Sequence, residues 1–330
     1  MSDAPRPHGR VARPGSYAPV WWLPDGHTQT LWAALCRRVP PVVARRERIE
    51  LPDGDFVDLA HLGADAAPAV LVLHGLEGDL QSPYARALMH AIAARGWHGV
   101  LLHFRGCSGE PNRLPRHYHS GDTGDLAHVL ALLRRRAPAL AVVGYSLGGN
   151  VLLKYLGERG ADADVAAACA VSVPFDLALA ADTLNRGFAR IYQRRLVTSL
   201  QAKARRKFAR IAAPIELTEL ARWRDFRSFD ERVTAPLHGF ASADDYYARS
   251  SSRPFLRDIA VPTLIVHAED DPFLDPRGIP SAPELGAPVM LELVERGGHV
   301  GFVATEDGWL ERRITDFVAV ASPDHAAVGI

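Results

Sequence analysis

The chain of 330 residues is long enough for one large domain or two small ones, and its 48% hydrophobic residues allow a sizeable core. Its 38 basic and 38 acidic side chains cancel, which excludes a protein built mainly to coat nucleic acid. The three cysteines match neither a disulfide framework nor a zinc site, and the sequence lacks both a secretory signal and a run of about 18 apolar residues. We therefore expect a cytoplasmic protein.

The first forty residues are predicted to form an arm and an entry segment outside the core. Residues 1–19 contain Arg and Pro without hydrophobic periodicity and are expected to form a mobile arm. Residues 21–35 are aromatic and rich in turn signals. Strands are then expected at 45–51 and 56–61, on either side of an Asp-Gly turn.

From residue 68 onward, short apolar runs alternate with helical patterns. Strands are predicted at 69–73, 100–104, 140–143 and 165–173, and helices at 83–95, 125–135 and 149–156. This alternation indicates an α/β protein with a mainly parallel sheet covered by helices on both faces.

The alternation stops near Pro174, and strand signals return only at 262–267 and 289–294, before a last helix at 307–318. We therefore expect a single core, formed by residues 41–174 and 258–330, with a helical cap inserted at 175–257. The tail at 322–330 is expected to be frayed.

A nucleophile motif lies in the middle of this alternation. Gly144-Tyr145-Ser146-Leu147-Gly148 matches G-x-S-x-G, and it follows a predicted strand and opens a predicted helix. That context is typical of the nucleophile elbow of the α/β-hydrolase fold, where the glycines allow a tight turn and the serine hydroxyl is exposed above the sheet. Ser146 is therefore the predicted nucleophile.

The partners of Ser146 follow from chain order, because this fold places the acid and then the histidine after the nucleophile. Asp271 is favoured as the acid, since it follows a strand and precedes Pro272; Asp270 stays as the alternative and Asp176 as a weaker one. His299 is the predicted base, because the glycines around it let the backbone bend toward Ser146. The competing histidines are His27, His74, His103, His117, His119 and His267.

An oxyanion hole is predicted at His74-Gly75-Leu76-Glu77-Gly78, directly after the strand at 69–73. Acyl transfer creates a tetrahedral oxyanion that two backbone N–H groups can stabilise. Leu147, the residue after the nucleophile, is expected to supply one of them and Leu76 the other. His74 is placed to brace this loop.

Several longer strings add a family resemblance that extends over most of the chain. They are DGHTQT at 25–30, HGLEGD at 74–79, FRGCSGEPN at 104–112, YHSGD at 118–122, GYSLGGNVLLKYLGE at 144–158, SVPFDL at 172–177, DYY at 245–247, HAEDDPF at 267–273 and GGHVGF at 297–302. With them the chain resembles the YheT-like α/β hydrolases, which are related to the eukaryotic alpha/beta-hydrolase-domain lipases. The resemblance implies a Ser146–Asp271–His299 triad and hydrolysis of carboxylic esters, with short-chain esters or acylglycerols as substrates.

These residues predict acyl transfer in two steps, with His299 as general base and an ester of Ser146 as intermediate, and no metal or organic cofactor is required. An acyltransferase with the same triad and a non-catalytic binding protein of the same fold are the alternatives. The substrate is expected to be a small ester or a lipid. The sequence predicts neither the acyl length, the alcohol group nor the oligomeric state, and it assigns no role to His27.

The predicted cap contains a basic stretch without any acidic residue: Arg186, Arg190, Arg194, Arg195, Lys203, Arg205, Arg206, Lys207 and Arg210. Apolar residues interleave with it, which predicts amphipathic helices. Two interpretations stay open. One is a lid that contacts anionic membrane lipid, and the other, which we favour, is a solvated face balanced by acidic residues elsewhere.

Overall fold

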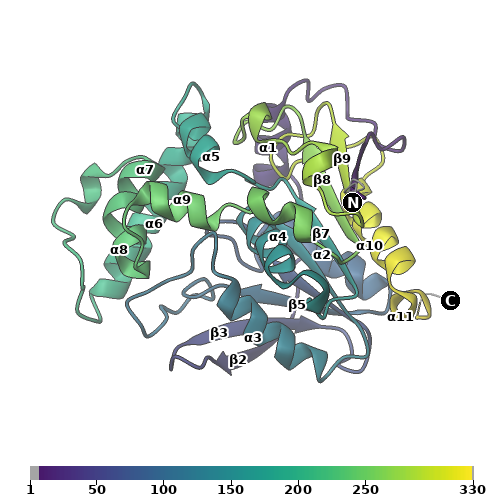
Figure 1. Ribbon diagram of the computed structural model, residues 1–330, viewed down its shortest axis with the longest axis horizontal. Helices are drawn as coiled ribbons and strands as arrows, with labels where there is room; N and C mark the ends of the chain where they lie inside the picture. Colours follow the sequence, from purple (N-terminus) through teal and green to yellow (C-terminus); the bar gives the residue numbers. More distant parts are fainter. Residues whose placement is uncertain (1–6, 329–330) are drawn as a thin grey trace, which may run out of the picture.

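The computed structural model describes residues 7–328 and contains a nine-stranded sheet within them (Figure 1). Its order is β1-β9-β8-β7-β6-β4-β5-β3-β2. The pairs β2–β3 and β3–β5 are antiparallel and the other pairs are parallel, so β3 runs against the remaining strands. The strands are β1 (Arg10–Ala12), β2 (Arg45–Glu50), β3 (Phe56–Leu62), β4 (Ala69–Leu73), β5 (His98–His103), β6 (Leu140–Tyr145), β7 (Ala167–Val171), β8 (Thr263–Ala268) and β9 (Val289–Val294). This confirms the prediction of a mainly parallel sheet.

Helices cover both faces of this sheet. The longer helices are α1 (Gly26–Leu35), α2 (Pro83–Ala94), α3 (Thr123–Arg134), α4 (Leu147–Arg159), α5 (Leu177–Leu184), α6 (Ala189–Phe208), α9 (Ala243–Ser250) and α10 (Trp309–Ala321). The short ones are α7 (Phe226–Phe229), α8 (Ala235–His238) and α11 (Pro323–Ala326). Buried residues of α3 and α4 pack on one face and those of α2 and α10 on the other. The apolar strands alternate between the two layers: in β4, Leu71 faces the first and Val72 the second.

Between β7 and β8, the described chain forms helices α5 to α9 and no strand. Helices α6 to α9 lie to one side of the sheet (Figure 1). They have apolar clusters of their own, one around Val197, Phe229 and Val233 and another around Tyr246 and Tyr247. None of the described helices is long and apolar enough to cross a lipid bilayer.

The two ends of the chain are more ordered than the sequence suggested. Within the predicted arm, β1 pairs in parallel with β9 and forms the edge of the sheet; residues 1–6 of that arm lie outside the described part. The turn-rich entry segment forms α1, because Asp25 caps it by accepting a hydrogen bond from the backbone N–H of Thr28. In the described part of the tail, residues 322–328, α11 is ordered and buries His325 against Trp97; the last two residues lie outside the described part.

Candidate active site

Ser146 lies at the sharp turn between β6 and α4 in a strained backbone conformation, with a φ of 50°. The turn is possible only with glycine on either side. A β-carbon at Gly144 would lie 2.5 Å from the carbonyl oxygen of Gly148, and one at Gly148 would lie 2.6 Å from that of Leu73. The turn exposes the Ser146 hydroxyl at the carboxyl end of the sheet and places the first helical N–H, that of Leu147, beside it.

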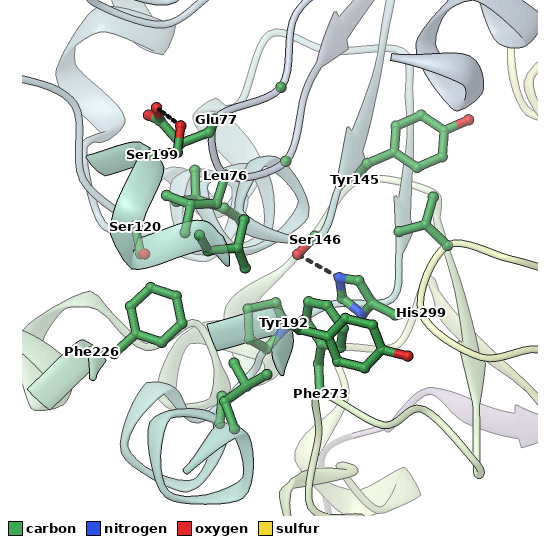
Figure 2. Close-up of a pocket in the computed structure, with 18 of the residues that line it drawn as sticks. Leu76, Glu77, Ser120, Tyr145, Ser146, Tyr192, Ser199, Phe226, Phe273 and His299 are labelled. Atoms are coloured by element: carbon green, nitrogen blue, oxygen red, sulfur yellow. Dashed lines mark hydrogen bonds between the residues drawn. The ribbon is translucent and has the colours of Figure 1, made fainter. Parts of the chain in front are cut away.

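Ser146, His299 and Asp271 meet at this end of the sheet. Figure 2 shows the contact between Ser146 and His299. The His299 Nε2 atom lies 2.9 Å from Ser146 Oγ, and its Nδ1 atom lies 2.8 Å from Asp271 Oδ2. The Asp271 side chain is 1% exposed, and its other oxygen accepts a hydrogen bond from the backbone N–H of Phe273 at 2.9 Å. The Phe273 ring stacks on the imidazole at a centroid distance of 4.0 Å. The histidine ring is therefore held by its acid partner on one edge and by an aromatic face.

The two alternative acids have other positions. Asp270 is adjacent to Asp271 but accepts hydrogen bonds from the backbone N–H groups of Gly297 and Gly298, at 2.8 and 2.9 Å. It therefore anchors the loop that carries His299 rather than contacting the imidazole, and it is not solvent-directed. Asp176 caps α5 through the backbone N–H of Leu179.

The entry segment supports the same loop, a role that sequence reasoning missed. The Thr30 hydroxyl accepts a hydrogen bond from the His299 N–H at 2.8 Å and donates to the Gly26 carbonyl at 2.6 Å. The Gln29 side-chain amide forms two hydrogen bonds with the backbone of Val303: its oxygen accepts from the Val303 N–H, and its nitrogen donates to the Val303 carbonyl. Gly26 packs so closely on the loop of the acid that a β-carbon there would lie 1.9 Å from the Asp270 carbonyl oxygen. The string DGHTQT was the available signal, but its contacts are nearly 270 residues away in the sequence.

The backbone N–H groups of Leu76, in the loop after β4, and of Leu147, at the start of α4, donate no hydrogen bond to any described residue. The neighbouring N–H groups are occupied: Gly75 donates to the Tyr84 hydroxyl and Glu77 to the Tyr118 hydroxyl, each at 2.8 Å. Of these three consecutive amides, only that of Leu76 is thus left available. This is the arrangement that an oxyanion hole requires.

His74 links the loop at 74–78 to the end of β5, in line with the bracing role suggested by its position. Burial lowers the pKa of His74 to about 3, so the imidazole is neutral at pH 7. Its Nδ1 atom lies 2.7 Å from the Gly75 carbonyl oxygen, and its Nε2 atom accepts from the Phe104 N–H at 3.2 Å. A neutral imidazole with one donor and one acceptor satisfies both contacts.

The cap is attached to the loop at 74–78 through Glu77. This residue has a φ of 56°, and its carboxylate accepts a hydrogen bond from Ser199 at 2.9 Å and forms an ion pair with Lys203 at 2.5 Å. Both partners belong to α6, and Lys203 also contacts Cys107 of the core. These contacts tie α6 to the loop that carries Leu76.

A cavity of about 480 Å³ opens above Ser146, between the core and the cap (Figure 2). Apolar side chains of α5, α6 and α7 form one part of its wall: Leu177, Ala180, Ala181, Leu184, Leu196, Leu200 and Phe226. His27 does not line this cavity; its Nδ1 atom lies 3.1 Å from the Tyr192 hydroxyl, and Tyr192 packs on Phe273. It is thus a contact between α1 and the cap, not a competing base. The cavity suits an ester with a sizeable apolar part.

Known proteins are similar to this chain in sequence and in architecture. A family model described as the alpha/beta hydrolase fold matches residues 68–304. The chain is 47% identical over 315 residues, 92% of either chain, to YheT of Escherichia coli, whose name describes it as an esterase. It is 30% identical to human phospholipase ABHD3 over 87% of this chain and 74% of that one. It is 29% identical to the monoacylglycerol lipase of Saccharomyces cerevisiae, over 81% and 62%.

Among solved structures, an esterase of Pyrococcus furiosus superposes with a TM-score of 0.57 at 14% identity, covering 95% of this chain and 98% of that one. The hydrolase GrgF of a Penicillium species superposes with a TM-score of 0.58 at 18% identity, covering 86% and 100%. At these identities the likeness concerns the fold alone.

Proposed function

The chain belongs to the alpha/beta hydrolase fold family and resembles its YheT-like members, and from this premise we propose that it hydrolyses carboxylic esters through an acyl-enzyme on Ser146. The observation that carries the proposal is the hydrogen-bonded series Ser146–His299–Asp271, with 2.9 and 2.8 Å between successive partners. Relatives named as esterase and lipases support an ester substrate.

In this mechanism, His299 Nε2 takes the Ser146 proton as Oγ attacks the ester carbonyl. The N–H groups of Leu76 and Leu147 stabilise the oxyanion, and Asp271 orients the imidazole and stabilises its charged form. The alcohol leaves with the proton from His299. Water, activated by the same imidazole, then releases the acid and restores Ser146.

Product analysis tests hydrolysis against acyl transfer to another alcohol. p-Nitrophenyl butyrate is incubated with the protein in buffer, with and without glycerol as competing acceptor. We expect free butyrate as the main product in both cases, with p-nitrophenol released in equal amount. Butyrylglycerol as the main product would identify an acyltransferase, and absence of p-nitrophenol release above the buffer rate would contradict hydrolysis of this ester.

We further propose that the outer face of the cap contacts anionic lipid. The basic stretch divides in two: Lys203 and Lys207 point inward, the latter donating to the carbonyl oxygens of Leu114 and Arg116. Seven arginines on and beside α6 are exposed, and none has an acidic partner within 4.0 Å among the described residues: Arg186, Arg190, Arg194, Arg195, Arg205, Arg206 and Arg210. Phe188 and Ile191 are exposed beside them, at 48% and 57%.

Sedimentation with vesicles checks this contact. The protein is expected to bind vesicles that contain phosphatidylglycerol, more strongly at low salt than at physiological salt, and to leave neutral vesicles unbound. Replacing Arg190, Arg194 and Arg205 together by Gln is expected to weaken binding roughly a hundred-fold, at about 1 kcal/mol for each arginine. The control replaces three exposed arginines away from the cap, Arg10, Arg135 and Arg159, and is expected to bind as the wild type does. No binding at either salt would refute the contact.

A further inference from the structure

The cap half of the cavity contains a group of polar side chains that the triad does not use. They are Ser120, Asp230, Thr234, Tyr246 and Tyr247; all of them line the cavity, and all are more than nine-tenths buried. Ser120 lies on the opposite side of the cavity from His299 (Figure 2). A polar cluster inside a largely apolar cavity commonly sets the orientation of a ligand.

Two sequence strings with no part in the triad meet at this cluster. Ser120 comes from YHSGD at 118–122, and Tyr246 from DYY at 245–247. The Tyr246 hydroxyl donates to Ser120 Oγ at 2.9 Å and accepts from the Ser120 N–H at 3.1 Å. The Asn150 side chain reinforces this junction by donating to the backbone carbonyls of Ser120 and Ser250, each at 2.8 Å. The Ser120 hydroxyl is thus fixed at a junction of core and cap.

Asp230 adds a buried carboxyl group to the same cavity. Its oxygens accept hydrogen bonds from the hydroxyls of Thr234 and Tyr247, at 2.6 and 2.8 Å, and no lysine or arginine forms an ion pair with it among the described residues. Burial raises the pKa of Asp230 and the two hydrogen bonds lower it; burial has the larger effect, and the resulting pKa is about 6. Asp230 begins a π-helical turn, Asp230–Thr234, a local distortion often found at functional sites.

Counting hydrogen-bonding capacity identifies what the cluster still offers to a ligand. The Tyr246, Tyr247 and Thr234 hydroxyl protons are all donated within the cluster. The Ser120 hydroxyl accepts one bond, and its own proton has no acceptor among the described residues. Each carboxylate oxygen of Asp230 accepts one side-chain bond and retains a free lone pair. The unused capacity is one donor, on Ser120, and acceptor sites on Asp230.

We propose that this cluster is a subsite for a free hydroxyl group carried by the ester substrate. A hydroxyl both donates and accepts, so it matches the unused acceptor sites of Asp230 and the unused donor of Ser120. The inference rests on the proposed esterase function. Such a hydroxyl has two chemical sources: the alcohol part of the ester, as in a partial glyceride, or a hydroxylated acyl chain.

Matched pairs of esters test the subsite and separate its two sources. The first pair is 1-monobutyrylglycerol and propyl butyrate, and the second is the p-nitrophenyl esters of 6-hydroxyhexanoic and hexanoic acid. The readout is the ratio of kcat/KM within each pair, hydroxylated over plain. We expect the wild type to favour the hydroxylated member of one pair by roughly ten- to hundred-fold, as for one well-formed buried hydrogen-bonded group. The favoured pair identifies the source.

Two variants and a control assign this preference to the cluster. Ser120→Ala removes the donor, and Asp230→Asn replaces an acceptor oxygen by an amide; each is expected to bring the ratio to within about three-fold of unity. Ser228→Ala removes a cap hydroxyl whose hydrogen bonds within the described part of the chain all go to Asp225, and it is expected to keep the wild-type ratio. Should Asp230→Asn fail to fold, Ser120→Ala carries the test by itself.

A wild-type ratio near unity in both pairs would overturn the subsite. So would a loss in Ser120→Ala that is equal for both members of a pair, since that is the effect of a merely structural residue. Either result leaves the esterase proposal intact as long as the plain esters are hydrolysed. Failure of the esterase function appears differently, as an absence of hydrolysis with all four esters.

Discussion

Ser146→Ala is expected to abolish ester hydrolysis, lowering kcat by about 10⁴- to 10⁶-fold. The hydroxyl is the attacking atom in the proposed mechanism, and no other serine lies within hydrogen-bond distance of His299 Nε2 among the described residues. The residual rate would come from the oxyanion hole and substrate binding alone. The fold should be retained, because among residues 7–328 the side chain makes only this one hydrogen bond. The measurement is initial-rate kinetics with p-nitrophenyl butyrate, beside a thermal unfolding curve.

Labelling with a fluorophosphonate probe gives an independent readout that does not require the correct substrate. The wild type should be labelled at Ser146, and Ser146→Ala should not be labelled at all. Ser199→Ala is a stringent control, since Ser199 lines the same cavity but hydrogen-bonds to Glu77. Labelling that persists in Ser146→Ala would refute the assignment of the nucleophile, and an unlabelled wild type would favour a non-catalytic binding protein.

The residues around the nucleophile were predictable because they either belong to one short motif or follow it in a fixed order along the chain. The elbow needs glycine at positions 144 and 148, and a five-residue pattern records that need. The fold also fixes the order of acid and histidine, so Asp271 and His299 could be proposed without knowing any distance. Parallel strands then bring their carboxyl ends, and with them these side chains, to one edge of the sheet.

The support of His299 was not predictable in the same way. Thr30 and Gln29 act through contacts that span most of the chain, and no periodicity or spacing rule connects them with the loop at 297–303. The helix that carries them was itself hidden by an aromatic, turn-rich composition. Its start depends on one cap, Asp25 with Thr28, which is a weak signal in a single sequence.

The orientation of the basic side chains in the cap was also not predictable from the sequence. The sequence shows a run of basic residues. It does not show that Lys203 and Lys207 point toward the core while the arginines are exposed. Both residue types have the same charge, so only the position of the α6 surface relative to the core separates them. The polar cluster at Ser120 and Asp230 was invisible for another reason, since its members come from three separate segments that meet only in the folded chain.

Asp271→Asn is expected to lower kcat by about 10⁴-fold while leaving the fold intact. The amide has the same shape as the carboxylate, but it presents either a donor or a weaker acceptor to His299 Nδ1. If the amide nitrogen faces the ring, the imidazole carries its proton on Nε2 and cannot accept the proton of Ser146. If the amide oxygen faces it, the imidazolium formed during attack loses its compensating charge. Either arrangement disables the base, so the defect should appear in kcat and in kcat/KM alike.

Asp270→Asn is the matched control, because it alters the adjacent carboxylate in the same loop. Asp270 Oδ1 accepts two backbone N–H groups, and an amide oxygen can accept the same two bonds. Hydrolysis should therefore fall by no more than about ten-fold. The reverse ranking, with Asp270→Asn the more severe, would show that positioning of the loop outweighs the contact with the imidazole and would reassign the acid. Both variants remove one negative charge from neighbouring positions. If the loss of charge near the site were the cause, the two variants would lose equal amounts of hydrolytic activity. Direct pairing of Asp271 with His299 instead predicts that their activities differ by about a thousand-fold.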